Sequence, residues 1–271
     1  MMERARVVAV VLACAACAPI SGEVSSHELN SDLDTFALTV RVPPSYATSP
    51  ERTYSWVLQL DGRVPSLNEF DTTARLASEQ NLDVVIVGIN SATGEGPGRG
   101  RLRDYTIPAD LAPDQWGGTG GAPAFRVLVR DRIIPFIEQN YRVKPDVSKR
   151  ALFGHSLGGL FGAYCFTEEP LFGAIVSASP SLVYDAGRMH GVIDSMPVTA
   201  RTPSTLLMTA GILEGPEMVV PMRTFARQAR EKNFAGLEVS EETFPVDHIG
   251  SVEPSFRAGL RCRSRAESPA T

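Results

Sequence analysis

A serine flanked by glycines is the clearest nucleophile in this 271-residue chain. Gly154-His155-Ser156-Leu157-Gly158 fits the G-x-S-x-G pattern, in which a strand turns at once into a helix and presents the serine hydroxyl at the apex. Apolar Ala151-Leu152-Phe153 precedes it and a helix-forming run follows. Larger side chains at the glycine positions should collide with the neighbouring strand and helix. The pattern therefore predicts covalent catalysis by Ser156.

A serine hydroxyl needs a base to remove its proton as it attacks, and the chain has four histidines. His248 follows the last predicted strand, where enzymes with this elbow carry their base. His190, in a polar connection, is the fallback. His155 adjoins the nucleophile, points away from the hydroxyl and is expected to be packed. His27 lies in a polar segment near the N-terminus.

The base in turn needs an acid that holds its tautomer and stabilises the imidazolium. The chain order serine, acid, histidine points to the loop after the predicted strand 206–208. In that loop Glu214 is nearest the strand end and is the favoured acid. Glu217 fits the start of the next helix and stays open as an alternative. Asp185 and Asp247 are weaker candidates, the second because adjacent side chains seldom reach each other correctly.

Two backbone N–H groups should bind the oxyanion of the tetrahedral intermediate. One is expected from Leu157, the residue after the nucleophile. The other is expected from the loop after an earlier strand, Leu60-Asp61-Gly62-Arg63, and we assign it to the Arg63 N–H. A backbone donor predicts that side-chain changes at position 63 are tolerated.

Strands that alternate with helices must position these groups. The pattern predicts an α/β fold, an α/β-hydrolase-type parallel sheet covered on both faces, with the reactive groups at the carboxyl ends of its strands. It places the domain at 35–263 and a frayed tail at 264–271. The predicted strands are 36–42, 54–60, 84–87, 151–153, 174–176, 206–208 and 237–241, and the predicted helices are 67–77, 125–139 (bent at Pro135), 157–166, 218–232 and 252–262.

Residues 91–121 differ from the rest of the chain. They contain eight glycines and little periodic apolar content, so we expect a long loop, either a functional lid or a disordered insert.

The first 20 residues indicate export. A basic leader precedes an almost wholly apolar run that is too short to span a bilayer as a helix, as in a signal segment. Cys14 and Cys17 are alternative lipidation sites; ordinary cleavage that removes both is the other reading. A lipid anchor would be the protein's only membrane contact, and the mature protein would be periplasmic, membrane-anchored or secreted. The polar residues 21–34 then read as a flexible tether.

Composition gives no reason to expect nucleic acid as a partner, because the net charge is −5 and the basic residues are scattered. Beyond the leader only Cys165 and Cys262 remain, so a disulfide framework is not expected, and Cys165 reads as a small core residue. No histidine or cysteine pair has the spacing of zinc ligands. We expect no metal or cofactor, and a small-molecule ester as the substrate.

Together these residues resemble a known family: the putative esterases of the α/β-hydrolase type, which include esterase D, the enterobactin-type siderophore esterases and, more distantly, the mycolyl transferases. The similar segments extend over most of residues 36–260. Tyr184, where relatives often carry an aromatic pair, and the 91–121 loop depart from the pattern. The similar segments are Leu60-Asp61-Gly62, Arg103-Asp104-Tyr105-Thr106, Gly154 to Gly159, Ser177-Ala178-Ser179-Pro180-Ser181, Gly211 to Pro216, and Asp247-His248 through Gly259-Leu260.

The resemblance implies one α/β-hydrolase domain, a serine–acid–histidine triad and cofactor-free hydrolysis of an ester or thioester. It also implies an oxyanion donor after the Asp-Gly pair, in agreement with Arg63. An acyltransferase with the same triad and a non-catalytic ligand-binding relative are the alternatives. The intact Ser156, Glu214 and His248 argue against the second. The family likeness and the export signal make siderophore lactones a hypothesis for the substrate.

Overall fold

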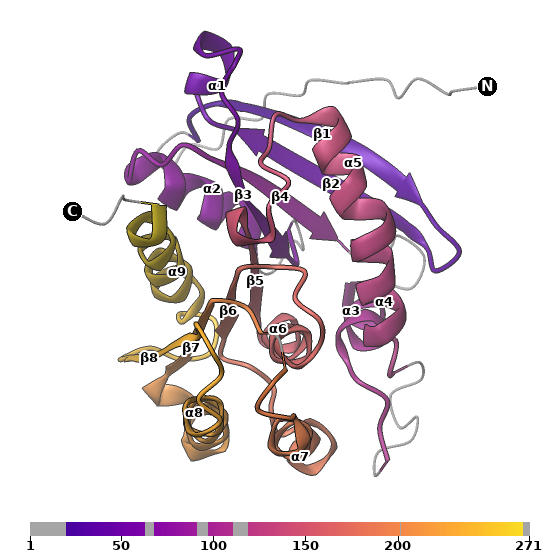
Figure 1. Ribbon diagram of the computed structural model, residues 1–271, viewed down its shortest axis with the longest axis vertical. Helices are drawn as coiled ribbons and strands as arrows, with labels where there is room; N and C mark the ends of the chain where they lie inside the picture. The colour runs from indigo at the N-terminus through magenta and orange to yellow at the C-terminus, as the bar shows by residue number, and fades with distance from the viewer. Residues whose placement is uncertain (1–19, 63–67, 91–96, 111–118, 201, 268–271) are drawn as a thin grey trace.

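The computed structural model describes residues 20–62, 68–90, 97–110, 119–200 and 202–267. Among these residues eight strands form one sheet in the order β1-β2-β4-β3-β5-β6-β7-β8. β2 pairs antiparallel with β1 and β4, and the strands from β4 to β8 all run parallel (Figure 1). The α/β prediction is therefore confirmed. The strands are β1 Glu23–Asn30, β2 Thr35–Val42, β3 Ser55–Leu60, β4 Val84–Asn90, β5 Arg150–His155, β6 Ala174–Ala178, β7 Thr205–Gly211 and β8 Glu238–Phe244.

Helices cover both faces of the sheet, as Figure 1 shows. α2 and α9 pack on one face, where Phe256 contacts Phe153 of the central strand and Phe70 lies in the same apolar cluster. α3 to α8 cover the other face, where Phe125 of α4 meets Phe161 of α6 edge to face. Strands buried on both faces explain the unbroken apolar runs in the sequence. The helices are α1 Ser45–Thr48, α2 Glu69–Glu79, α3 Pro97–Tyr105, α4 Ala122–Leu128, α5 Ile134–Asn140, α6 Leu157–Thr167, α7 Arg188–Ser195, α8 Pro216–Glu231 and α9 Val252–Glu267.

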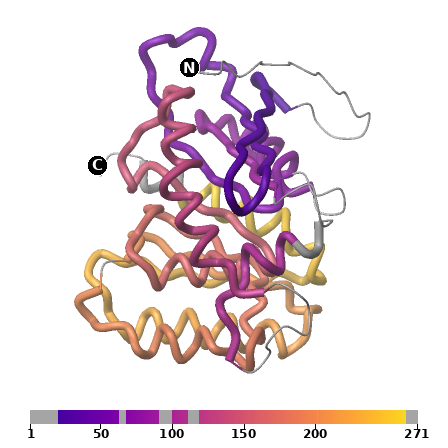
Figure 2. Tube along the Cα trace, turned by 90° about the vertical axis from the view of Figure 1, so that its right-hand side faces the viewer, coloured from indigo at the N-terminus to yellow at the C-terminus, as the bar shows by residue number. Residues whose placement is uncertain are grey.

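The path of the chain brings distant segments to one edge of the sheet. Figure 2 shows the indigo N-terminal strands at one end of the molecule and the orange helices α7 and α8 at the other. The strands between these ends are parallel, so all their carboxyl ends face the same way. The loops that follow β3, β5, β6, β7 and β8 therefore share one edge, as expected for a site in a parallel sheet.

The predicted tether is wrong for most of its length. Residues 23–30 form β1, which pairs with β2 along its whole length. As an edge strand β1 buries only Leu29, so its polar sequence carries no apolar alternation. Residues 1–19, with the predicted export signal, Cys14 and Cys17, lie outside the described residues. No helix in the described part has the length and hydropathy to cross a membrane.

The predicted loop 91–121 contains a helix. α3 spans Pro97–Tyr105, and the segment after its first turns is buried: Asp104, Tyr105 and Thr106 are each at most 1% exposed. Residues 91–96 and 111–118 lie outside the described residues. At the other end of the chain α9 continues to Glu267, beyond the predicted start of the frayed tail at 264.

Near Pro135, where a bend is predicted, the helix changes from α-helical to π-helical hydrogen bonding. Between α4 and α5 the chain forms a π-helical turn, Val129–Ile133, and Pro135 follows in the first turn of α5. Proline has no N–H for the ladder and its ring crowds the preceding turn, so a local widening accommodates it.

Candidate active site

The turn between β5 and α6 is a strained elbow centred on Ser156. Its φ of 60° and ψ of −117° are avoided by residues with a side chain. Backbone bonds hold this conformation: the Ser156 N–H donates to Ala178 O at 2.9 Å, and its carbonyl accepts from the N–H groups of Leu160 and Ser181. The half-buried side chain stands at the carboxyl edge of the sheet. The elbow therefore presents a hydroxyl group, as the sequence predicts.

The first glycine of the motif is required by close backbone packing, and the second lies against the turn after β3. A Cβ at Gly154 would lie 2.3 Å from the carbonyl oxygen of Gly158, and a Cβ at Gly158 would lie 3.3 Å from Oδ2 of Asp61. The first contact is impossible without moving the backbone. The second shows how closely α6 approaches the turn after β3, so the elbow and that turn adjoin.

His248 and Glu214 meet in a short hydrogen bond. Nδ1 of His248 lies 2.6 Å from Oε2 of Glu214, which fixes the proton on Nδ1 because an ionised carboxylate only accepts. Glu214 ends the short 3₁₀ turn after β7, and His248 follows β8. The Glu214 side chain is 1% exposed, whereas that of His248 is 37% exposed. The imidazole thus has one edge held by a buried acid while much of its ring faces solvent.

Three donors keep Glu214 ionised. Burial alone would raise its pKa, but hydrogen bonds from His248, the Ser179 hydroxyl and the Gly211 N–H outweigh burial and lower the pKa. Ser179 Oγ lies 2.5 Å and Gly211 N 2.6 Å from Oε1. Ser179 is fully buried with a positive φ of 40°, so the turn after β6 serves to place this donor.

The other acids predicted as alternatives lie elsewhere. Glu217 is in the first turn of α8, beside Gly215, and is exposed. Asp247 accepts from the Gly250 N–H within its own turn. Asp185 accepts from the Asp110 N–H at 3.0 Å. Of these four carboxylates, Glu214 is the one hydrogen-bonded to His248.

His190, the alternative base, also lies elsewhere. His190 lies on α7, and its Nδ1 is 2.8 Å from Oε1 of Gln228 on α8. This contact joins two helices that cover the sheet. Of the two, His248 is the histidine whose ring is hydrogen-bonded to a carboxylate.

Ser156 and His248, the predicted nucleophile and base, share no hydrogen bond among the described residues. There the hydrogen bond of Ser156 Oγ is to Ser181 Oγ, at 3.4 Å. The His248 ring packs at a tilt of 42° against that of His155, the residue before Ser156, with 4.5 Å between ring centroids. Bonds between nucleophile and base are often long in free enzymes and shorten when substrate binds.

One of the two predicted oxyanion donors lies in the described part. Leu157 is the first residue of α6, so its N–H has no acceptor within the helix and adjoins the Ser156 side chain. Arg63 lies outside the described residues, and its role stays a prediction. The turn that leads to it is held firmly, because the Gly62 N–H donates to Ile89 O at 3.0 Å.

Two segments singled out in the sequence meet behind this turn. The Arg101 guanidinium of α3 donates two hydrogen bonds to the Asp61 carboxylate, at 2.7 and 3.0 Å, and Asp61 is fully buried. The Asp61 N–H also points to the Tyr105 hydroxyl at 3.4 Å. The positive φ of Asp61, 55°, is thus held by contacts from α3. The Arg101–Asp61 ion pair explains why a glycine- and arginine-rich segment folds against the site.

Several supporting residues escape a reading of the sequence. Ser251 Oγ donates to the His248 carbonyl at 2.7 Å and lies 2.7 Å from Ser179 Oγ. His155, predicted to be packed, is fully buried, and its Nε2 lies 2.9 Å from the same carbonyl. Glu69 of α2 lies behind His155. The one sequence feature that could have identified Glu69 is its place as a carboxylate on the apolar face of a predicted helix. The supporting serines have no such feature in the sequence.

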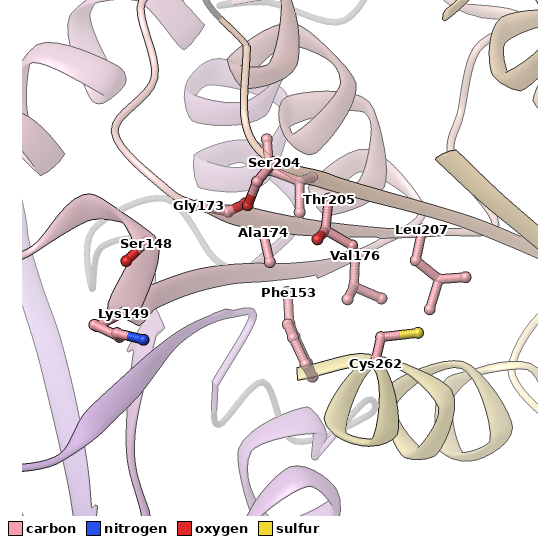
Figure 3. Close-up of a pocket in the computed structure, with 12 residues that line it drawn as sticks. Ser148, Lys149, Phe153, Gly173, Ala174, Val176, Ser204, Thr205, Leu207 and Cys262 are labelled. Carbon is pink, nitrogen blue, oxygen red and sulfur yellow. The ribbon is translucent and has the colours of Figure 1, made fainter. Parts of the chain in front are cut away.

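A small cavity lies at the opposite edge of the sheet. About 30 Å³ in volume, it is enclosed by the amino ends of β5, β6 and β7 and by α9, with Phe153, Val176 and Cys262 on its wall (Figure 3). That volume holds one or two water molecules, not an ester. It is separate from the elbow, which stands at the carboxyl ends of the same strands.

Comparison with known proteins decides the family. The sequence model described as "Putative esterase" matches residues 26–204. The chain belongs to this esterase family. It is 32% identical over 144 residues to the ferri-bacillibactin esterase BesA of Bacillus subtilis, covering 49% of each chain. It is likewise 32% identical over 147 residues to the apo-salmochelin esterase of Escherichia coli O6:H1, covering 51% of this chain and 46% of the relative.

The chain spans about half the length of these two esterases, but solved structures match it almost throughout. The BES protein from Bacillus cereus superposes with a TM-score of 0.77 at 22% identity, covering 93% of this chain and 99% of that one. An IroE-like serine hydrolase from Shewanella oneidensis gives 0.73 at 25% identity, covering 89% and 79%. These matches show that the family's α/β-hydrolase fold extends over the whole sheet.

Proposed function

We propose that this esterase-family protein hydrolyses carboxylic esters through an acyl-enzyme, with Ser156 as nucleophile, His248 as general base and Glu214 as the acid. The observation that carries the proposal is the 2.6 Å bond between Glu214 and His248 beside a strained serine elbow. These three groups come from the ends of β5, β7 and β8. The parallel sheet brings the loops after these strands to one edge, and the Glu214–His248 bond joins two of the three groups there.

In the first half-reaction Ser156 Oγ attacks the ester carbonyl carbon while Nε2 of His248 takes the hydroxyl proton. The carbonyl electron pair moves to oxygen, and the Leu157 and Arg63 N–H groups bind that oxyanion. Glu214 stabilises the imidazolium. Collapse of the intermediate breaks the ester C–O bond, and the imidazolium protonates the leaving alcohol. In the second half-reaction His248 takes a proton from water as the water oxygen attacks the acyl-enzyme. The imidazolium then returns the proton to Ser156 Oγ as the acyl–serine bond breaks, and the carboxylic acid is released.

The surroundings of the site favour a substrate with apolar or aromatic groups. Leu213 and Ile249, next to the acid and the base, are 69% and 56% exposed, and Val183, near Ser181, is 49% exposed. Two relatives are named for siderophore esters, ferri-bacillibactin and apo-salmochelin. We therefore propose a siderophore-type lactone, handled by an exported enzyme, as the substrate class.

The test uses purified protein and short p-nitrophenyl esters. Ser156→Ala should lower the hydrolysis rate by at least about 10³-fold. Ser195→Ala removes an exposed hydroxyl that donates to Val192 O within α7, and should keep the wild-type rate. Unchanged activity of Ser156→Ala would end the proposal.

Substrate class and acceptor are tested separately. A panel of esters and lactones that includes a catecholate trilactone tests the siderophore proposal, and no cleavage of the trilactone would remove that substrate while leaving ester hydrolysis intact. Reaction in the presence of an alcohol acceptor tests transfer. Formation of a new ester at the expense of the free acid would make the protein an acyltransferase with the same residues.

A further inference from the structure

Two buried polar atoms face each other behind the proposed base. Oε1 of Glu69 on α2 lies 3.5 Å from Nδ1 of His155 on β5, and both side chains are 0% exposed. Neither atom has another hydrogen-bond partner among the described residues. A buried polar atom left unpaired destabilises the folded state, so two such atoms that face each other indicate a proton between them.

The remaining bonds of the pair show which nitrogen of His155 holds a proton. Nε2 of His155 lies 2.9 Å from the carbonyl oxygen of His248, and a carbonyl only accepts, so Nε2 must carry hydrogen. In a neutral imidazole Nδ1 is then an acceptor. The other oxygen of Glu69 accepts from Gln59 Nε2 at 2.9 Å. Oε1 can therefore satisfy Nδ1 only if the carboxyl group is protonated.

An ion pair is the other arrangement that would satisfy both atoms, with a carboxylate facing an imidazolium. The 3.5 Å separation is longer than an ideal hydrogen bond in either arrangement, so burial decides between them. An ion pair would take two charged groups out of water. The guanidinium of Arg101 is already held by both oxygens of Asp61. A neutral pair satisfies both atoms without burying charge.

The charged groups around the pair favour the same arrangement. Burial and the neighbouring Asp61 raise the pKa of Glu69 well above its usual value, against the opposing effect of Arg101. Burial, helped by His248, lowers the pKa of His155 to about 3, against the opposing effect of Glu214. The other groups in contact are uncharged: Gln59 of β3 and the Ser251 hydroxyl before α9.

We propose that Glu69 is a protonated carboxylic acid that donates to Nδ1 of His155, and that this neutral pair positions the backbone of His248. The proposal rests on the proposed role of His248 as base. Two donors converge on the His248 carbonyl, Nε2 of His155 and Oγ of Ser251 at 2.7 Å. By donating to Nδ1 of His155, Glu69 keeps the ring hydrogen on Nε2, which makes Nε2 a donor to that carbonyl. Neither member of the pair needs to touch substrate; both are positioning residues.

Glu69→Gln tests the protonation state, because an amide copies a protonated carboxyl group. The Gln oxygen can accept from Gln59 while its NH₂ donates to His155. We expect kcat and the pH profile of kcat/KM within about twofold of wild type. Glu69→Met, which leaves Nδ1 without a donor, should lower kcat by about tenfold with little change in KM, since a small displacement of a catalytic group slows the chemical step. A folded Glu69→Gln variant with a large loss of kcat would overturn the proposal.

Infrared difference spectra test the proton without using activity. At pH 7 the spectrum of wild type minus Glu69→Gln should show the carbonyl stretch of a protonated carboxylic acid, and deuterium exchange should shift it. A carboxylate band in its place would overturn the proposal. This result stands even if Ser156→Ala retains activity, so failure of the neutral pair and failure of the esterase mechanism are distinguishable.

Discussion

At the residue scale, the carboxylate of Glu214 should be indispensable to rate. Glu214→Gln would place an amide against Nδ1–H of His248 and favour the wrong tautomer, and it would remove the charge that stabilises the imidazolium. We expect kcat for a p-nitrophenyl ester to fall by on the order of 10³–10⁴-fold, with KM little changed, because the imidazolium exists only after the proton has moved.

The matched control for this substitution is Glu217→Gln. Glu217 is a carboxylate three residues further along the same loop, exposed and at the start of α8. Its variant should keep the wild-type rate in the same assay. The reverse pattern, with Glu217→Gln inactive and Glu214→Gln active, would make Glu217 the acid and contradict the geometry of the site.

The sequence indicates the proposed reacting groups more readily than the residues that support them. Ser156, Glu214 and His248 follow from a local motif and from chain order, both of which can be seen without a fold. The donors to Glu214 cannot be found this way, because Ser179 reaches it only after the turns that follow β6 and β7 are brought together. The link from Glu69 to His155 likewise joins a helix and a strand 86 positions apart in sequence.

At the scale of elements, the elbow depends on the absence of a side chain at Gly154. In Gly154→Ala the new Cβ would meet the Gly158 carbonyl at 2.3 Å, so β5 and α6 would have to separate. We expect a loss of about 1–3 kcal/mol in the free energy of unfolding, measured by urea denaturation, together with loss of esterase activity.

Gly191→Ala is the control for backbone packing. Gly191 lies in α7, and a Cβ there would meet no heavy atom within 4 Å. Because alanine favours helices, this variant should gain about 0.5–1 kcal/mol and keep its activity. Equal stability of the two variants would show that the contact at Gly154 does not constrain the elbow.

Elements with an apolar face are predictable from the sequence, and those held by other forces are not. The buried strands from β3 to β7 appear close to their predicted positions. β1 escapes prediction because an edge strand with one buried residue needs no apolar alternation. α3 escapes because the Arg101–Asp61 ion pair and the contacts of Tyr105 hold it, not an apolar stripe.

At the scale of the whole molecule, the neutral pair should leave a signature in the dependence of stability on pH. The pKa of Glu69 is raised in the folded protein, so the folded state binds a proton that the unfolded chain releases above its usual carboxyl pKa of 4.5. The contribution of Glu69 is therefore fully present below pH 4.5 and is lost as pH rises toward its folded pKa. Glu69→Gln has no such titration.

The difference between the two proteins isolates this effect, since every other group titrates in both. From pH 4.5 upward, wild type should lose stability relative to Glu69→Gln by up to about 1.4 kcal/mol per pH unit, until pH exceeds the folded pKa. Urea denaturation of both proteins between pH 4.5 and 8 measures it. An ionised Glu69 beside a neutral His155 would retain no extra proton, and wild type and variant would then show equal slopes. An ion pair holds the same number of protons as the neutral pair and would give the same slope, so the infrared band of the carboxyl group separates these two. The slope therefore shows whether the folded interior retains a proton that the unfolded chain releases, and the infrared band shows that this proton lies on Glu69.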